Sequence, residues 1–195
     1  MPVAITPLII SQLPIKRRGL TEFTYSRFLV PWLCGYEGRA LFLDADMAVT
    51  GDIAELFACG DSSSVQINKD QPKFEWTSAM LFNCAGCAML TPEYVDDAAN
   101  KLFDLEWAFS VGEFPSEWNH CVSYEQPRTD AKLYHYTSGL PCWVESSGLP
   151  EDEFWLAERD EMSRTCSWAD LMLKSVHAQP VIKRMLATRY GLKVA

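Results

Sequence analysis

The sequence lacks the features by which proteins cross membranes or bind nucleic acids. No stretch reaches the roughly twenty consecutive apolar residues that a membrane-spanning helix requires. Basic residues are scarce, because 17 Lys and Arg are set against 26 Asp and Glu, which gives a formal net charge of -9. A chain with this charge repels phosphate backbones and anionic lipids. We therefore expect no transmembrane segment and no nucleic-acid partner.

The sequence also lacks an export signal and a disulfide framework. Its N-terminal segment is apolar but contains Pro2, Pro7 and Pro14, with no basic residue before the apolar stretch. The seven cysteines are odd in number and scattered through apolar segments, a pattern typical of reduced thiols. Both observations predict a cytoplasmic protein. Cys84 and Cys87 form a Cys-x-x-Cys pair, so a thiol redox protein is one alternative, which would need an exposed thiol of low pKa.

No repeat or Gly/Ser-rich linker interrupts the 195 residues, so we predict a single domain over 1–195. Apolar runs predict strands over 3–10, 39–43, 65–67, 79–82 and 132–136. Helical spacing and capping residues predict helices over 21–35 with a kink at Pro31, 53–57, 91–107 and 150–175. This alternation indicates an α/β fold, with a core over 1–143 and a C-terminal helical part over 144–195. Four apolar residues of that part should pack as core, or alternatively cover an acceptor groove: Trp155, Trp168, Met172 and Leu173.

Two carboxylates follow the predicted strand 39–43. Asp44 and Asp46 are two residues apart, and side chains of an extended chain alternate with period two, so both can project to one side. Two carboxylates with open coordination positions suit Mg²⁺ or Mn²⁺ shared with substrate phosphates. The alternative is that both are ordinary acidic loop residues that cap the following segment.

Further motifs set these carboxylates in a specific context. The segments are 21–28 (TEFTYSRF), 44–56 (DADMAVTGDIAEL) and 132–139 (KLYHYTSG). They resemble the retaining, metal-dependent glycosyltransferases of family eight, the group that includes glycogenin and the bacterial lipopolysaccharide galactosyltransferases. The resemblance runs from about Val3 to Trp143.

This resemblance implies a GT-A fold, a Rossmann-like mixed sheet flanked by helices. It also implies a hexose transfer from a nucleotide-sugar donor, with UDP-hexose as the preferred donor, to a saccharide or related acceptor, with retention. The cofactor would be Mn²⁺ or Mg²⁺ held by Asp44, Asp46 and His135. A Lewis acid there would stabilise the charge that develops on the departing diphosphate.

Other site residues follow from the same resemblance. Donor contacts would come from Arg27, Ala45, Asn83 and Gly139, in addition to Asp44. Many relatives carry an Asp-Gln pair near the reacting sugar, and this pair is absent here. Glu117 and Asn119 stand near that place in the sequence, so they are candidate catalytic residues by proximity alone.

Relatives also begin with a strand and a helix before the segment that starts here at Met1. The resemblance therefore implies an N-terminally shortened GT-A domain. It leaves one alternative function, a truncated and non-catalytic remnant that keeps the metal ligands but cannot hold the nucleotide.

Overall fold

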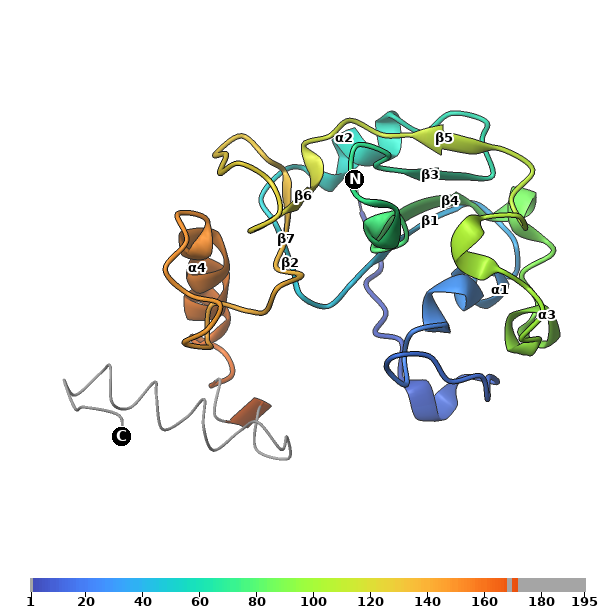
Figure 1. The fold of residues 1–195 in the computed structure, drawn as a ribbon, viewed down its shortest axis with the longest axis horizontal. Coiled ribbons are helices and arrows are strands. Elements are labelled where there is room, and N and C mark those ends of the chain that lie inside the picture. Colours follow the sequence, from blue (N-terminus) through green and yellow to red (C-terminus); the bar gives the residue numbers. More distant parts are fainter. Residues whose placement is uncertain (1, 168–169, 172–195) are drawn as a thin grey trace.

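The computed structural model describes residues 2–167 and 170–171, and two small sheets organise them (Figure 1). The first sheet has the order β1-β4-β3-β5, formed by β1 (Arg39–Leu43), β4 (Ala79–Asn83), β3 (Val65–Ile67) and β5 (Val111–Glu113). β4 runs antiparallel to β1 and β3, whereas β3 and β5 are parallel. The second sheet has the order β2-β7-β6, formed by β2 (Met47–Val49), β7 (Leu133–His135) and β6 (Trp118–Cys121). The fold is thus the mixed α/β arrangement that the sequence predicts.

Short helices flank these sheets. They are α1 (Val30–Leu33), α2 (Ile53–Ala58), α3 (Pro92–Asp96) and α4 (Asp152–Met162), with 3-10 turns η1 (Ile10–Gln12), η2 (Ser26–Leu29), η3 (Lys73–Glu75), η4 (Cys84–Cys87) and η5 (Leu102–Asp104). In Figure 1, α1 and α3 lie near the four-stranded sheet, whereas α4 lies beside β2 and β7. Within the described residues, none of the helices is long and apolar enough to cross a bilayer.

β4 shows why apolar runs of this chain form strands. Met80 and Phe82 pack in one buried cluster with Val65 of β3, whereas Ala79 and Leu81 pack in a second cluster on the other face. A strand that is buried on both faces is apolar at every position, which is the pattern that predicted it. The predicted strands over 39–43 and 65–67 match β1 and β3 at both ends.

Helix α3 begins as predicted but ends early. The Thr91 hydroxyl accepts a hydrogen bond from the Tyr94 amide, and Pro92 follows the cap. The helix ends at Asp96 instead of continuing to 107. Arg17 explains this end, because its guanidinium donates hydrogen bonds to three carbonyls of the segment. They are those of Val95, Asp97 and Asn100. The Arg17 guanidinium therefore satisfies carbonyls at the end of this helix.

Two N-terminal predictions are wrong. Residues 3–10 form no strand, and Val3 and Ile5 are exposed, because Pro7 removes a donor and no neighbouring strand pairs with the segment. The helix predicted over 21–35 is instead η2 followed by α1. The change of helix type falls between Leu29 and Val30, just before Pro31, and Gly35 follows at a φ of 62°, in the left-handed region that ends helices.

Three strands were not predicted: β2, β5 and β6. Each has only three or four residues, so its apolar pattern is too short to stand out. At the C-terminal end, α4 runs over a shorter range than 150–175. Trp155 packs in a buried cluster with Tyr134 and Tyr136, as predicted for core. Trp168, Met172 and Leu173 lie outside the described residues.

Candidate metal centre and donor cleft

The backbone brings the predicted metal ligands together at the junction of the two sheets. Asp44 and Asp46 lie between β1 and β2, directly after the carboxyl end of β1. β2 pairs antiparallel with β7, which places Met47 opposite His135, and the Tyr136 amide donates to the Asp46 carbonyl over 2.9 Å. Strand pairing therefore fixes His135 beside the Asp-x-Asp turn, although 89 residues separate His135 from Asp46.

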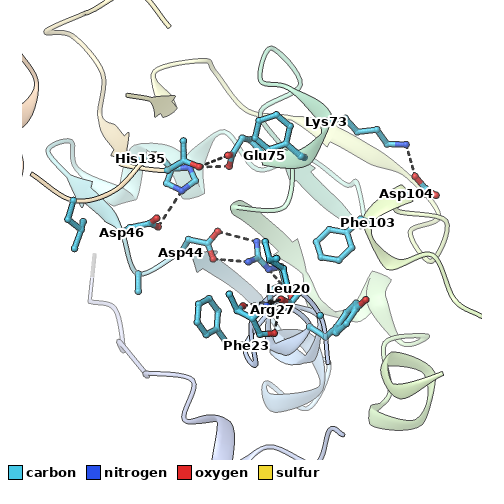
Figure 2. A pocket seen from close by; sticks show the side chains of 18 residues that line it. Leu20, Phe23, Arg27, Asp44, Asp46, Lys73, Glu75, Phe103, Asp104 and His135 are labelled. Atoms are coloured by element: carbon cyan, nitrogen blue, oxygen red, sulfur yellow. Dashed lines mark hydrogen bonds and ion pairs between the residues drawn. The ribbon is translucent and has the colours of Figure 1, made fainter. Parts of the chain in front are cut away.

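The side chains converge as well (Figure 2). One ligand atom from each of Asp44, Asp46 and His135 lies within 4.8 Å of the others. His135 Nε2 is 3.3 Å from Asp46 Oδ1. Burial raises the pKa of the Asp46 carboxyl, but the hydrogen bond and charge of His135 outweigh it, so this pKa lies below its ordinary value. Asp46 is therefore ionised at neutral pH.

Arg27 forms an ion pair with the other carboxylate, that of Asp44. Its Nη2 and Nη1 lie 3.0 and 3.2 Å from the two oxygens of Asp44, a bidentate contact. Nη1 also donates to the Thr77 carbonyl over 2.8 Å, and Nε donates to the Thr24 carbonyl over 3.2 Å. Burial raises the pKa of Asp44, and the Arg27 charge opposes this rise. The guanidinium thus stabilises Asp44 in its charged form and fixes its direction.

Glu75 is a site residue that the sequence did not indicate. It is buried, its Oε2 lies 3.4 Å from His135 Nδ1, and its Oε1 accepts a 2.6 Å hydrogen bond from the Thr137 hydroxyl. When a cation binds at Nε2, a carboxylate at Nδ1 keeps the ring proton there and leaves the Nε2 lone pair for the cation. Nothing in the segment around Glu75 distinguishes it from a surface acid, and only its burial reveals its role.

The donor set fits a divalent cation. Asp44, Asp46 and Glu75 supply three negative charges, whereas Arg27 supplies one positive charge. With a neutral imidazole the cluster carries an excess of two negative charges in a partly buried setting, which is costly without a counter-ion. Carboxylate oxygens with one imidazole nitrogen suit Mn²⁺ or Mg²⁺.

These groups form one wall of an open cleft of about 1090 Å³. Apolar side chains, including Leu20, Phe23 and Phe103, line another part of it, and the exposed Lys73–Asp104 ion pair lies at its rim (Figure 2). This volume is slightly above the roughly 300–1,000 Å³ typical of small-molecule pockets. The cleft combines an apolar surface with a few convergent charged groups, which is the usual composition of a ligand site.

The donor residues implied by the resemblance divide into two groups. Arg27 and Ala45 line the cleft, and Gly139 stands between the cleft residues Thr137 and Leu140. Asn83 does not reach it. The antiparallel register pairs Asn83 with Arg39, whereas the Asp-x-Asp end of β1 is paired with the first residue of β4. Four strand residues, about 13 Å, separate the two ends, so the structure places Asn83 away from the Asp-x-Asp turn.

The structure places the two candidate catalytic residues elsewhere too. Glu117 lies 3.8 Å from the Lys132 ammonium and is not among the residues that line the cleft. Asn119 is fully buried and donates to the Ser78 hydroxyl over 3.0 Å. The Ser78 carbonyl in turn accepts from the Asp44 amide over 3.0 Å. Asn119 therefore supports the backbone that carries Asp44 and is not among the residues that line the cleft.

The Cys-x-x-Cys pair has the opposite properties to a redox site. Cys84 and Cys87 are both buried free thiols in η4. Burial raises the pKa of each to about 12. A redox motif needs an exposed thiol with a lowered pKa, so the thiol redox alternative is wrong.

Comparisons with known proteins agree with this fold. No protein-family profile matches the chain. It is 30% identical to Protein CDI of Arabidopsis thaliana in a 202-residue alignment that covers 84% of this chain and 77% of that protein. The glycosyltransferase GlyE of Streptococcus pneumoniae TIGR4 matches with a TM-score of 0.50 and 19% identity, over 69% of this chain and 42% of that chain. An active-site mutant of LgtC matches with a TM-score of 0.49 and 13% identity, over 80% of this chain and 75% of that chain.

The chain thus spans less than half the length of GlyE. At 19% identity this likeness shows the fold, which is the GT-A arrangement of a mixed sheet with flanking helices.

Proposed function

This chain belongs to the family of Arabidopsis Protein CDI, and we propose that it is a divalent-metal-dependent glycosyltransferase. In this proposal it moves a hexose from a nucleoside diphosphate sugar, UDP-hexose by preference, to a saccharide or related acceptor. The GT-A fold is consistent with this activity, but a fold hosts many functions. The proposal therefore depends on the site.

One observation carries the proposal, the convergence of Asp44, Asp46 and His135 on one point beside the cleft. These three residues would hold Mn²⁺ or Mg²⁺. When bound, such a cation stabilises the negative charge that develops on a departing nucleoside diphosphate.

The protein residues around this point have separate tasks. Arg27 holds Asp44 by two hydrogen bonds and so sets the direction of one ligand. Glu75 holds His135 Nδ1 and keeps the Nε2 lone pair turned to the ligand cluster. Lys73 at the rim supplies a positive charge for a diphosphate, once its side chain leaves the exposed pair with Asp104. Apolar side chains that line another part of the cleft limit access of water to the sugar.

Thermal unfolding with UDP and Mn²⁺ tests this function. We expect UDP to raise the midpoint only when Mn²⁺ is present, and Asp46→Ala to abolish the rise. At a UDP concentration of about 100 Kd the gain is about 2.7 kcal/mol, or roughly 5–10 °C for a chain of this size. Asp160→Ala is the matched control, because Asp160 is an exposed carboxylate on α4 that pairs with Arg159.

Two outcomes would contradict the proposal. If Mn²⁺ alone raises the midpoint and UDP adds nothing at millimolar concentration, the chain is the non-catalytic remnant that keeps its metal ligands. If UDP raises the midpoint equally in Asp46→Ala, the nucleotide binds somewhere other than this cluster.

A further inference from the structure

His135 presents its second ring nitrogen to a different group of ligands. His135 Nδ1 lies 3.4 Å from Glu75 Oε2 and 3.8 Å from Cys121 Sγ. One ligand atom from each of these residues lies within 4.8 Å of the other two, and all three residues are buried. A thiol, a carboxylate and an imidazole therefore converge on a point that the cleft ligands Asp44 and Asp46 do not share.

The backbone holds this second cluster in place. Cys121 of β6 is the parallel partner of His135 of β7, and the Val122 amide donates to the His135 carbonyl over 2.9 Å. The Cys121 amide donates to Glu125 over 2.7 Å. Glu75 is fixed from another element, η3, by the hydrogen bond from Thr137. The three ligands are thus positioned before any ion binds.

The spacing matches the edges of a tetrahedral zinc site. With ordinary Zn–N, Zn–O and Zn–S bond lengths, nitrogen and oxygen ligands lie about 3.4 Å apart and nitrogen and sulfur ligands about 3.6 Å apart. The corresponding distances here are 3.4 and 3.8 Å. A thiolate with an imidazole selects Zn²⁺ over Mg²⁺ or Mn²⁺, which prefer oxygen.

We propose that Glu75, Cys121 and His135 Nδ1 form a second metal site that binds a thiophilic divalent cation, Zn²⁺ foremost. The ion enters from the cleft, because Glu75 and His135 line it. Three protein ligands leave the fourth tetrahedral position for water.

Proton balance is simple at this site. Burial raises the pKa of the Cys121 thiol, and the nearby carboxylates of Glu75 and Glu125 raise it further, so the thiol is protonated without a cation. Binding of Zn²⁺ releases that proton to solvent as the Zn–S bond forms. The imidazole binds Zn²⁺ through an unprotonated Nδ1 and carries its one ring proton on Nε2.

The proton on Nε2 links the two sites, a consequence that rests on the proposed function. With Zn²⁺ on Nδ1, Nε2 carries a hydrogen that Asp46 Oδ1 accepts over 3.3 Å. His135 then has no lone pair for Mn²⁺ in the cleft. Zn²⁺ therefore weakens the Mn²⁺-dependent binding of UDP, and by linkage Mn²⁺ weakens the binding of Zn²⁺ by the same factor.

Cobalt is the probe, because a Co²⁺–thiolate bond gives a near-ultraviolet charge-transfer band that oxygen and nitrogen ligands do not give. One equivalent of Co²⁺ is added to the full chain after chelator treatment, followed by one equivalent of Zn²⁺. We expect a band in the wild type that Zn²⁺ removes. Cys121→Ser should lose the band, whereas Cys59→Ser, which removes an exposed thiol, should retain it.

Two further variants keep the proposal falsifiable. Glu75→Gln retains the thiol and should weaken Co²⁺ binding at least about tenfold, even if Cys121→Ser fails to fold. Asp46→Asn should lose the UDP response but keep the band, so failure of the proposed function is distinguishable from failure of this site. Absence of the band in the wild type, or a band that survives Cys121→Ser, would overturn the second site.

Discussion

Replacement of Arg27 by methionine tests how the site keeps a partly buried carboxylate charged. The guanidinium makes two contacts with Asp44, at 3.0 and 3.2 Å, and donates to the Thr77 and Thr24 carbonyls. The Arg27 and Asp44 side chains are only 11% and 19% exposed, so water replaces little of this bonding. We expect Arg27→Met to lower the free energy of unfolding by about 3 kcal/mol near neutral pH, at the low end for a buried pair that loses one partner.

The size of this loss should depend on pH. Burial already raises the pKa of Asp44 above its ordinary value of 3.8, and the charge of Arg27 is the largest influence that lowers this pKa. Without Arg27 this pKa rises further. A carboxyl with a raised folded-state pKa binds a proton more readily in the folded state, so its destabilising effect grows as pH rises through that pKa. The difference between wild type and variant should therefore shrink as pH falls from about 7 to about 4.

Urea unfolding followed by tryptophan fluorescence measures both effects. The double variant Arg27→Met/Asp44→Asn removes the buried charge as well, and should recover at least about 1 kcal/mol relative to Arg27→Met near neutral pH. Arg18→Met is the matched control, because Arg18 is exposed. A loss below about 1 kcal/mol in Arg27→Met, an equal loss at both pH values, or no recovery in the double variant would refute this reasoning.

Four further predictions concern other residues of the chain. Glu75→Gln should weaken Mn²⁺-dependent UDP binding by roughly 10- to 100-fold in calorimetric titration, because it removes the charge that orients His135; Glu106→Gln, on the surface, should not change it. Arg17→Ala should lower the free energy of unfolding by about 1–2 kcal/mol, since three carbonyls at the end of α3 lose their donor, whereas a change as large in Arg18→Ala would contradict this account. Alkylation at about pH 8 should be fast at the exposed thiols Cys34 and Cys59. It should be slow at Cys84 and Cys87, which are buried and whose pKa is raised to about 12. Mass spectrometry measures these rates, and equal rates at all four thiols would show that burial does not protect Cys84 and Cys87. The same raised pKa values predict that the free energy of unfolding falls as pH rises from 9.0 toward 12, because these thiols ionise earlier in the unfolded state.

Local patterns predicted the parts of the fold that depend on neighbours in sequence. The apolar run of β1 and the cap at Thr91 are examples, because burial and side-chain capping act over a few residues. The alternation of Asp44 and Asp46 after β1 is equally local. Their link to His135 came from a motif resemblance, since nothing between these residues indicates that β2 and β7 pair.

Features that depend on distant contacts were not predictable. α3 ends where Arg17 reaches its carbonyls, and about eighty residues separate the two along the chain. Asn83 was assigned to the donor site by the family resemblance, but the direction of β4 places it at the end of the strand that lies away from the Asp-x-Asp turn. Glu75 has no sequence signature, because an acid in a short polar turn looks like any surface acid until its burial beside His135 is known.

Calorimetric titration of UDP into the protein with and without Mn²⁺ tests the central claim most directly. The account predicts saturable binding of UDP that requires Mn²⁺ in the wild type and in Asp160→Ala, and no binding in Asp46→Asn. Binding of UDP that is independent of Mn²⁺, or that is unchanged in Asp46→Asn, would contradict the assignment of Asp44, Asp46 and His135 as the metal centre of a nucleotide-sugar site.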